Sequence, residues 1–210
     1  MVEFERLDRN NLKKLTVVAK TYREAFATEP WKEVSRGPAC GKFYGPENSP
    51  GSRCPCGCGK LEEAYPVIKT VRYIRNEISK PNAIAFSANK DGKTVGFAWA
   101  YEETGLEFAE TKYAPENREF VANLVGKDNE VIYLSECGFL KAERQKGLGT
   151  EITAQIIKEG VKFGLPFLLR TNKGSAAKCI AEKLGMKPIM GSDDTPPDPE
   201  NPERILFYKE

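Results

Sequence analysis

One stretch constrains the fold of this chain more than any other: a strand-like run at residues 131–140, a turn at residues 141–149 and a helix-like run at residues 150–164. The turn contains Arg144, Gly147 and Gly149 in an R-x-x-G-x-G pattern. A loop of this kind, opening a helix directly after a strand, points several backbone N–H groups at one place, where the helix dipole adds positive potential. The turn therefore predicts a site that favours a phosphate group.

Helical and strand-like patterns alternate along the rest of the chain. Asp91-Gly92 indicates a tight hairpin, and Pro66 indicates that the second helical run begins near it. The expected helices are residues 10–28, 61–80, 115–125, 150–164 and 175–184; the expected strands are residues 4–7, 83–88, 94–101, 131–140, 166–170, 186–190 and 204–209. This order predicts a mixed α+β fold in one domain, residues 1–210, with a parallel element after the turn.

Two segments break the pattern and are expected to be insertions. Residues 102–129 are polar and poorly periodic. Residues 35–60 are rich in Gly and Pro and have few core-forming residues, so they need a crosslink to hold a fixed structure. Four cysteines lie in the second segment, and our favoured interpretation is a structural zinc site, because four thiolates complete a closed tetrahedron. The C-x-C-x-C spacing is unusually tight, so an iron–sulfur cluster, a redox disulfide and unliganded thiols remain alternatives. The four residues are Cys40, Cys54, Cys56 and Cys58.

The composition excludes several function classes. The chain has no histidine, which rules out Ser-His-Asp and Cys-His catalysis and leaves a carboxylate, Lys, Tyr, Cys or a water chain as general base. A net charge of +2 gives no argument for a nucleic-acid or membrane partner. The charged N-terminal residues have no signal-peptide core, so a cytoplasmic location is expected. No G-x4-G-K-[ST] motif is present, which argues against a P-loop protein.

The turn and the order of elements resemble the GNAT N-acetyltransferase superfamily. FLKAERQKGLGTEI is similar to its acetyl-CoA motif, and RTNKGSAAKCIAEKLGMKPI to its next segment, where a helix ends in a Leu-Gly-Phe-like sequence. Residues 27–33 are similar to the turn after the first helix of many members. The resemblance implies a mixed, mostly antiparallel sheet flanked by helices, with a splayed parallel pair at the acetyl-CoA loop. It covers nearly the whole chain except the two insertions.

The same resemblance implies transfer of an acetyl group from acetyl-CoA to a primary amine by direct attack. The backbone amides of residues 145–150 would hold the pyrophosphate, and the main chain around residues 139–141 would bind the pantetheine arm. The amide of Phe139 or Leu140 would polarise the thioester carbonyl. The implied cofactor-binding residues are Phe139, Leu140, Lys141, Arg144, Gln145, Lys146, Gly147, Leu148, Gly149, Thr150 and Asn172, the last being two residues early for the usual spacing.

Glu136 is the first candidate for the general base, because burial in an otherwise uncharged strand would raise the pKa of its carboxyl group toward neutrality. Tyr133 and Glu130 are the runners-up, with core packing and a solvated strand end as the alternatives. At the family position of a Tyr that protonates the leaving thiolate, this chain has Ala181. The thiolate is then expected to leave unaided, or with help from another Tyr such as Tyr208.

Two function classes remain open. The first is an acetyltransferase acting on a small-molecule or protein amine, and the second is a catalytically weak acyl-CoA-binding or partner-binding regulatory module; a homodimer is compatible with either. Cys137 and Cys179 are expected to be small, buried core residues. An acidic group that either attracts a cationic amine or forms a solvated face comprises Glu102, Glu103, Glu107 and Glu110.

Overall fold

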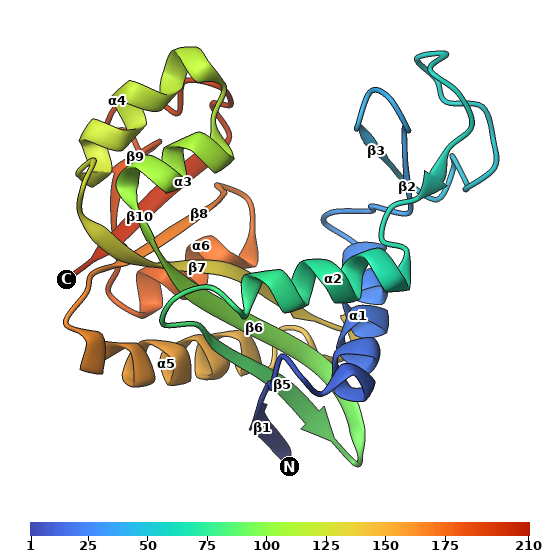
Figure 1. The fold of residues 1–210 in the computed structure, drawn as a ribbon, viewed down its shortest axis with the longest axis horizontal. Helices are drawn as coiled ribbons and strands as arrows, with labels where there is room; N and C mark the ends of the chain where they lie inside the picture. The colour runs from blue at the N-terminus through green and yellow to red at the C-terminus, as the bar shows by residue number, and fades with distance from the viewer. The chain divides into compact units, whose positions relative to one another are not determined.

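The computed structural model describes residues 1–210 (Figure 1). The helices are α1 (Leu12–Phe26), α2 (Val67–Glu77), α3 (Gly105–Lys112), α4 (Pro115–Val125), α5 (Leu148–Gly160) and α6 (Ala176–Lys183), with short 3-10 helices η1 (Lys141–Glu143) and η2 (Val161–Phe163). The strands are β1 (Val2–Arg6), β2 (Ser35–Arg36), β3 (Phe43–Tyr44), β4 (Glu62–Glu63), β5 (Ile84–Lys90), β6 (Lys93–Thr104), β7 (Glu130–Phe139), β8 (Phe167–Asn172), β9 (Lys187–Met190) and β10 (Arg204–Lys209). None of the helices has the length and apolar character that a membrane span requires.

Seven strands form one mixed sheet in the order β1-β5-β6-β7-β8-β10-β9. Strand β5 runs antiparallel to β1, and β10 runs antiparallel to both β8 and β9. Strands β7 and β8 are parallel, with Ile132 opposite Phe167 and Tyr133 opposite Leu168. Their ladder ends after these two residue pairs, while β7 continues to Phe139. The predicted α+β fold, with a mostly antiparallel sheet and a splayed parallel pair, is therefore confirmed.

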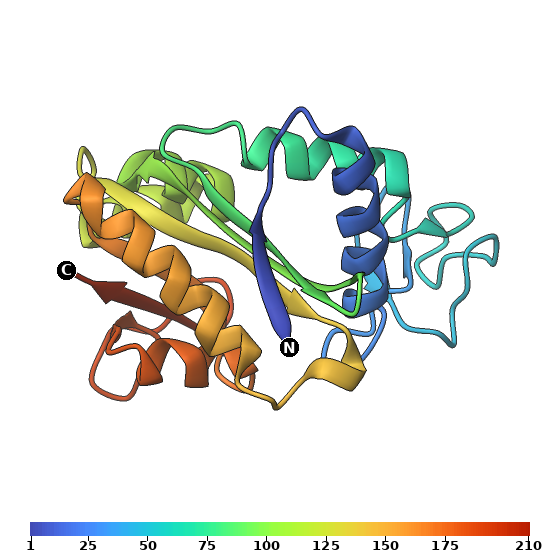
Figure 2. The ribbon, with the colours of Figure 1, turned by 90° about the horizontal axis from the view of Figure 1, so that it is seen from below.

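The chain divides into two compact units, which we describe separately. Unit 1 comprises Met1–Asn76, Phe86–Phe97 and Gly138–Lys146, and its core contains the buried face of α1, where Tyr22 stacks on Phe97 with ring centroids 5.1 Å apart. Unit 2 comprises Glu77–Ala85, Ala98–Cys137 and Gly147–Glu210. Its fully buried side chains include Ile132, Ile152, Ile156, Leu168 and Phe207. In unit 2, α5 lies along the strands of the sheet (Figure 2).

Several element boundaries follow from local signals. Asn11 caps α1 by accepting a hydrogen bond from the Lys14 amide over 3.0 Å, and α2 begins directly after Pro66. Asp91 and Gly92 adopt φ values of 50° and 75°, the left-handed pair that a tight hairpin between β5 and β6 requires. The predicted helix at Pro115–Val125 is present with the expected bounds.

Residues 102–129 contain a second helix that their polar composition did not reveal. Helix α3 begins with a capping box. The Glu107 amide donates a hydrogen bond to the Thr104 hydroxyl, and the Thr104 amide donates one to the Glu107 carboxylate over 2.8 Å. The buried residues of α3 and α4 include Phe108, Val121 and Val125. These two helices of unit 2 pack against each other (Figure 1).

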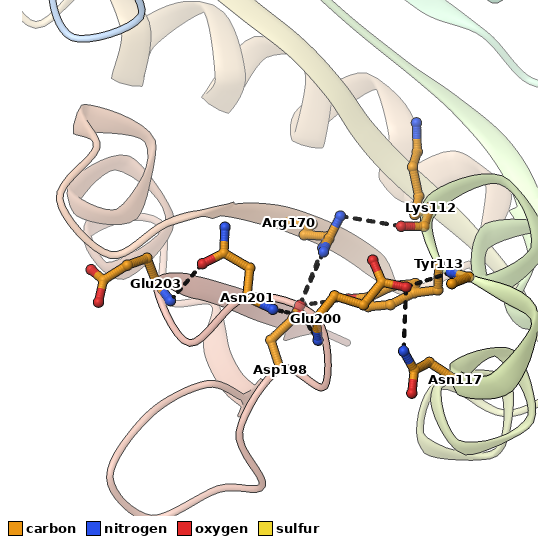
Figure 3. A network of polar contacts seen from close by, with 9 residues as sticks. Lys112, Tyr113, Asn117, Arg170, Asp198, Glu200, Asn201 and Glu203 are labelled. Carbon is orange, nitrogen blue, oxygen red and sulfur yellow. Dashed lines mark hydrogen bonds and ion pairs between the residues drawn. The ribbon is translucent and has the colours of Figure 1, made fainter. Parts of the chain in front are cut away.

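A buried ion pair fastens the loop before β10 to α3 (Figure 3). Arg170 Nη2 lies 3.2 Å from Asp198 Oδ2, and the Tyr113 hydroxyl donates to the same oxygen over 2.9 Å. Asp198 Oδ1 accepts hydrogen bonds from the backbone amides of Glu200 and Asn201. Because the Asp198 side chain has no exposed surface and both oxygens are engaged, we interpret this network as structural.

Replacing Asp198 with Ala is expected to lower the free energy of unfolding by about 3–5 kcal/mol, because the change leaves the buried charge of Arg170 uncompensated. Burial opposes ionisation of Asp198, but the Glu200 amide, Arg170 and Tyr113 outweigh it and lower the pKa of its carboxyl group. The stabilisation is therefore present above about pH 3.9, the unfolded pKa, and is lost as the pH falls through the folded pKa.

Denaturant unfolding at pH 7 and at about pH 3 measures both effects. The matched control is Asp194→Ala, which removes an exposed carboxylate from the same loop and should change little. A loss below about 1 kcal/mol for Asp198→Ala at pH 7 would refute the structural role.

Candidate functional site

The turn between β7 and α5 has the backbone conformation that the glycine pattern predicts. Gln145 and Gly147 have positive φ values of 63° and 85°, and Gly147 is the left-handed N-cap of α5. The first intrahelical bond runs from the Glu151 amide to the Gly147 carbonyl over 3.1 Å, and no side chain caps the helix. The amides of the first turn thus have no intrahelical partner, the arrangement that favours a phosphate. These are the amides of Leu148, Gly149 and Thr150.

The two glycines of the turn serve different needs. At position 147 the backbone is left-handed, a conformation that residues with a side chain rarely adopt, so a glycine is required there. Gly149 is favoured by packing, since a Cβ there would lie 2.8 Å from Ile180 Cδ1 of α6 and would displace the end of that side chain. The pattern therefore records one conformational constraint and one helix contact within unit 2.

Arg144 binds the backbone of unit 1 through three carbonyl groups. Its Nε donates to the Phe139 carbonyl over 2.9 Å, and its Nη2 donates to the Ala25 carbonyl over 2.7 Å and to the Thr28 hydroxyl over 2.9 Å. Nη1 donates to the Glu29 carbonyl. Burial lowers the pKa of Arg144. The side chain links the turn to the C-terminal end of α1, where carbonyl groups favour a cation.

We expect Arg144→Met to lower the free energy of unfolding by about 2–3 kcal/mol, because hydrogen bonds to a charged donor are worth more than neutral ones and the carbonyls lose their donor. Lys141→Met, in the same turn but exposed, is the control and should change little. Thermal unfolding of the two variants measures the difference. Equal stability of Arg144→Met and the native protein would contradict this role.

Cationic side chains gather at the edge of the turn in unit 1. The Glu143 carboxylate forms ion pairs with Lys146 and Lys90, each with a distance of 3.0 Å between the ammonium nitrogen and a carboxylate oxygen. The hydrogen bond from Lys146, followed by that from Lys90, lowers the pKa of Glu143. Two ammonium groups thus share one carboxylate, which leaves a positive charge beside the exposed backbone of Gln145 and Lys146.

The other predicted cofactor residues occupy varied positions. Phe139 is buried, and its ring lies so close to Gly96 that a Cβ there would come within 2.3 Å of Phe139 Cδ1. The Leu140 amide donates to the Val95 carbonyl over 2.9 Å, so of the two predicted donors to the thioester only Phe139 remains. Lys141 is exposed, and Asn172 is the half-buried last residue of β8.

The candidate bases on β7 differ in their surroundings. Glu136 is half-buried and Glu130 is exposed at the start of the strand. Tyr133 is buried, with its ring centroid 5.8 Å from that of Tyr101 and 5.2 Å from that of Phe108. Burial, together with the charge of Glu136, raises the pKa of the Tyr133 hydroxyl. Burial thus favours the protonated hydroxyl and supports core packing, the alternative interpretation of Tyr133, while its role as a base stays a prediction.

Both cysteines expected in the core are exposed, which corrects that prediction. For Cys137 the reason is that β8 pairs with β7 only as far as Tyr133, so nothing continues the ladder beside the later residues of β7. Ala181 is fully buried in α6, and Tyr208 is half-buried on β10, where burial raises the pKa of its hydroxyl.

A polar group that sequence reasoning missed lies in unit 2, at the end of α2 and on β6 and β7. Glu77 Oε2 accepts a hydrogen bond from the Ser135 hydroxyl over 2.7 Å. Lys80 Nζ lies 3.5 Å from Glu77 and 3.7 Å from Glu103, and 3.6 Å from the ring centroid of Tyr101. Glu103 is buried, and not part of a solvated acidic face as one interpretation had it. Glu103 and Tyr101 are two residues apart on β6 and so share one face of the strand. This spacing was the sequence signal that Glu103 is buried.

The predicted cysteine ligands come together in unit 1, beside a small sheet with the strand order β3-β2-β4. All four sulfur atoms lie within 4.8 Å of one another, and none is in a disulfide. Cys54 Sγ is 3.8 Å from Cys40 Sγ and 3.2 Å from Cys56 Sγ. A Cβ at Gly37 would lie 2.3 Å from Cys40 Sγ, so a residue without a side chain is needed at position 37, next to the sulfur atoms.

Comparison with protein families decides the classification. The model of the Acetyltransferase (GNAT) family matches residues 57–186, which is more than half of the chain. The chain belongs to the GNAT acetyltransferase family. The match includes the R-x-x-G-x-G turn and one of the four clustered cysteines, Cys58. No curated protein sequence matches this GNAT protein.

Solved structures share the GNAT fold along the whole chain. PH1933 from Pyrococcus horikoshii OT3 is 14% identical, with a TM-score of 0.57 and coverage of 100% of this chain and 98% of that one. The mosquito protein arylalkylamine N-acetyltransferase like 5b is 13% identical, with a TM-score of 0.57 and coverage of 100% of this chain and 99% of that one. PaiA N-acetyltransferase from Thermoplasma acidophilum, in complex with coenzyme A, is 12% identical, with a TM-score of 0.50 and coverage of 100% and 99%. At these identities the likeness establishes the fold alone.

Proposed function

We propose that this GNAT protein transfers the acetyl group of acetyl-CoA to a primary amine. The observation that carries the proposal is the left-handed Gly147 at the start of α5, which leaves the first-turn amides without intrahelical partners in a member of an acetyltransferase family. The pyrophosphate of acetyl-CoA suits these amides, and Lys146 adds positive charge. The PaiA structure in complex with coenzyme A supports the same ligand class.

The proposed reaction is direct attack of a neutral amine on the thioester. A lysine-like amine has a pKa of about 10.4 and begins protonated at pH 7, so a base must remove a proton. Glu136, on β7, is the base that the sequence alone suggests. The Phe139 amide is the proposed donor to the oxyanion, a contribution of about 3–4 kcal/mol in comparable sites. Because Ala181 carries no hydroxyl, the thiolate leaves without a proton from that position.

The acceptor is proposed to be a small-molecule or protein amine, with no nucleic-acid or membrane partner. We propose a cytoplasmic location, since all six cysteines are free and a reducing compartment keeps thiols reduced. A homodimer is compatible with this activity.

Incubating the protein with acetyl-CoA and a panel of primary amines tests the proposal. Free thiol should appear only when an amine is present, and the acceptor should gain the mass of one acetyl group. Acetyl-CoA binding without turnover on any amine would instead favour the regulatory module, for which the absent hydroxyl at Ala181 is the supporting observation.

We propose further that the cysteine group holds a structural zinc ion through Cys40, Cys54, Cys56 and Cys58. With Zn–S bonds of about 2.3 Å, tetrahedral ligands lie about 3.8 Å apart, and Cys40 and Cys54 have that separation. A hydroxyl and backbone amides surround the sulfur atoms: Tyr44 Oη lies 3.3 Å from Cys54 Sγ, and the Lys42 amide contacts Cys40. Four thiolates leave no open position, so the metal would stabilise the fold and take no part in acetyl transfer.

A further inference from the structure

The buried carboxylate of Glu103 has an oxygen that no hydrogen-bond donor of the protein serves. Its side chain is only 4% exposed, and Oε2 lies 3.7 Å from Lys80 Nζ. Oε1 is buried and has no hydrogen-bond partner. A buried acceptor without a donor costs about 1–3 kcal/mol, or more when charged, and folded proteins contain few of them. The position of Oε1 is therefore explained if a ligand supplies the missing donor.

The carboxylate of Glu103 favours a cation as this ligand, because the four charged groups around it balance one another. The charged groups that act on it are Lys80, Lys112, Glu77 and Glu107. Together with Glu103 itself they comprise three carboxylates and two ammonium groups, which gives a net charge of −1. Lys80 shows how an ammonium group is held here, between two carboxylates and over the face of Tyr101.

The polar group lies beside β7, the strand that leads to the turn. Tyr133 and Ser135, two residues apart on the strand, share one face, and Ser135 donates to Glu77. Cys137 Sγ would be 4.0 Å from a Cβ at Gly149, in the first turn of α5. Two residues of a strand span about 7 Å, so Ser135 is within about 7 Å along β7 of the position that contacts α5.

We propose that Glu103 receives the ammonium group of the acceptor at Oε1 and removes its proton. The inference rests on the proposed acetyl transfer and identifies the acceptor as a primary aliphatic ammonium ion. One N–H bond breaks as the proton passes to Glu103, and the nitrogen lone pair then attacks the thioester carbon. When the tetrahedral intermediate collapses, the C–S bond breaks and the second N–H proton passes by way of solvent to the thiolate. Glu103 then returns its proton to solvent.

The protonation equilibrium of Glu103 suits this role. Burial raises the pKa of its carboxyl group to about 7, Lys80 and Lys112 lower it, and Glu77 and Glu107 raise it. The carboxyl and carboxylate forms of Glu103 are therefore both accessible near pH 7, and a base with a pKa near the working pH is the most effective. Glu136 is half-buried and is the competing candidate.

Measuring kcat/KM against pH, with the best amine of the panel, tests the assignment. Glu103→Gln keeps the volume but removes the base, and should lower kcat/KM by about 100-fold or more and abolish a limb that rises near pH 7. Glu136→Gln should retain that limb, and Glu119→Gln, an exposed site on α4, should match the native protein. A Glu103→Gln enzyme with the native rate and profile overturns the proposal while leaving acetyl transfer intact.

Binding of n-butylammonium provides a readout that does not depend on turnover. In protein labelled with carboxyl carbon-13 in Glu, the Glu103 resonance, assigned with Glu103→Gln, should titrate near pH 7. Its midpoint should fall when n-butylammonium binds, because a cation at Oε1 favours the carboxylate, and 1-pentanol should have no such effect. If Glu103 responds but no amine is acetylated, the ammonium site stands and acetyl transfer falls. If Glu103 does not respond, the ammonium site falls.

Discussion

Removing the proposed zinc ion from the cysteine group is expected to unfold residues 35–63. Apparent zinc-binding free energies of structural sites are about 10–16 kcal/mol, which is more than this segment can gain from its own packing. Its strands β2, β3 and β4 have two residues each, and its buried side chains are few. Incubation with a strong chelator should release about one equivalent of zinc and make the segment sensitive to limited proteolysis.

The loss should extend into the rest of unit 1 through aromatic contacts. Phe43 of β3 stacks on Tyr65 with ring centroids 5.5 Å apart, and Tyr65 meets Tyr22 of α1 at 5.0 Å. Unfolding of the segment removes the first of these contacts, so the thermal midpoint of unit 1 should also fall. Cys54→Ser should reproduce the effect of chelation, since Cys54 is the most buried of the four ligands.

The matched control is Cys179→Ser, which changes an exposed cysteine on α6 in unit 2 and should retain the metal. Elemental analysis of the purified protein distinguishes the alternatives. Iron with inorganic sulfide would indicate a cluster in place of zinc. A metal-free protein whose stability does not respond to chelator would contradict any structural metal.

Replacing Gly147 with Val is expected to weaken acetyl-CoA binding by about 100-fold, or about 3 kcal/mol. A β-branched residue rarely adopts the φ of 85° found here, so the turn must change its conformation. That change moves the amides proposed to bind the pyrophosphate, and each charge-assisted hydrogen bond is worth about 1.5–3 kcal/mol. Calorimetric titration with acetyl-CoA measures the loss.

Gly164→Val provides a control with the same backbone cost. Gly164 has a φ of 69° after η2, and a Cβ there would meet nothing within 4 Å. Both variants should lose comparable stability, but only Gly147→Val should lose affinity for acetyl-CoA. Equal acetyl-CoA affinities for the two variants would refute the proposed role of the turn.

Local chemistry explains which parts of the fold could be predicted from the sequence. The Asp91-Gly92 hairpin and the strand at Arg204–Lys209 depend on neighbours within a few residues, and each is present. Helix α3 was missed because its capping box stands in an otherwise polar segment with weak periodicity. The four cysteines were brought together correctly because their clustering in the sequence already limited the distances between them.

The remaining features depend on contacts between distant segments. Arg144 donates hydrogen bonds to carbonyl groups at the end of α1 and just after it, 119 and 115 residues earlier in the chain. No local sequence pattern records these contacts. Glu103 stood among other acidic residues, and only the approach of Lys80 and the packing of β6 reveal that it is buried. Cys137 is exposed in the part of β7 beyond the residues with which β8 pairs, and the end of that pairing is a property of sheet geometry that the local sequence does not record.

Amide NMR of the nitrogen-15-labelled protein, titrated with acetyl-CoA, tests the central claim most directly. We predict that the amides of Gly147, Leu148, Gly149 and Thr150 show the largest changes, because the pyrophosphate is proposed to accept hydrogen bonds from them. The same titration with a CoA fragment that lacks the pyrophosphate should leave these amides unchanged. Saturable binding of acetyl-CoA that perturbs other residues and leaves these four amides unmoved would contradict the account.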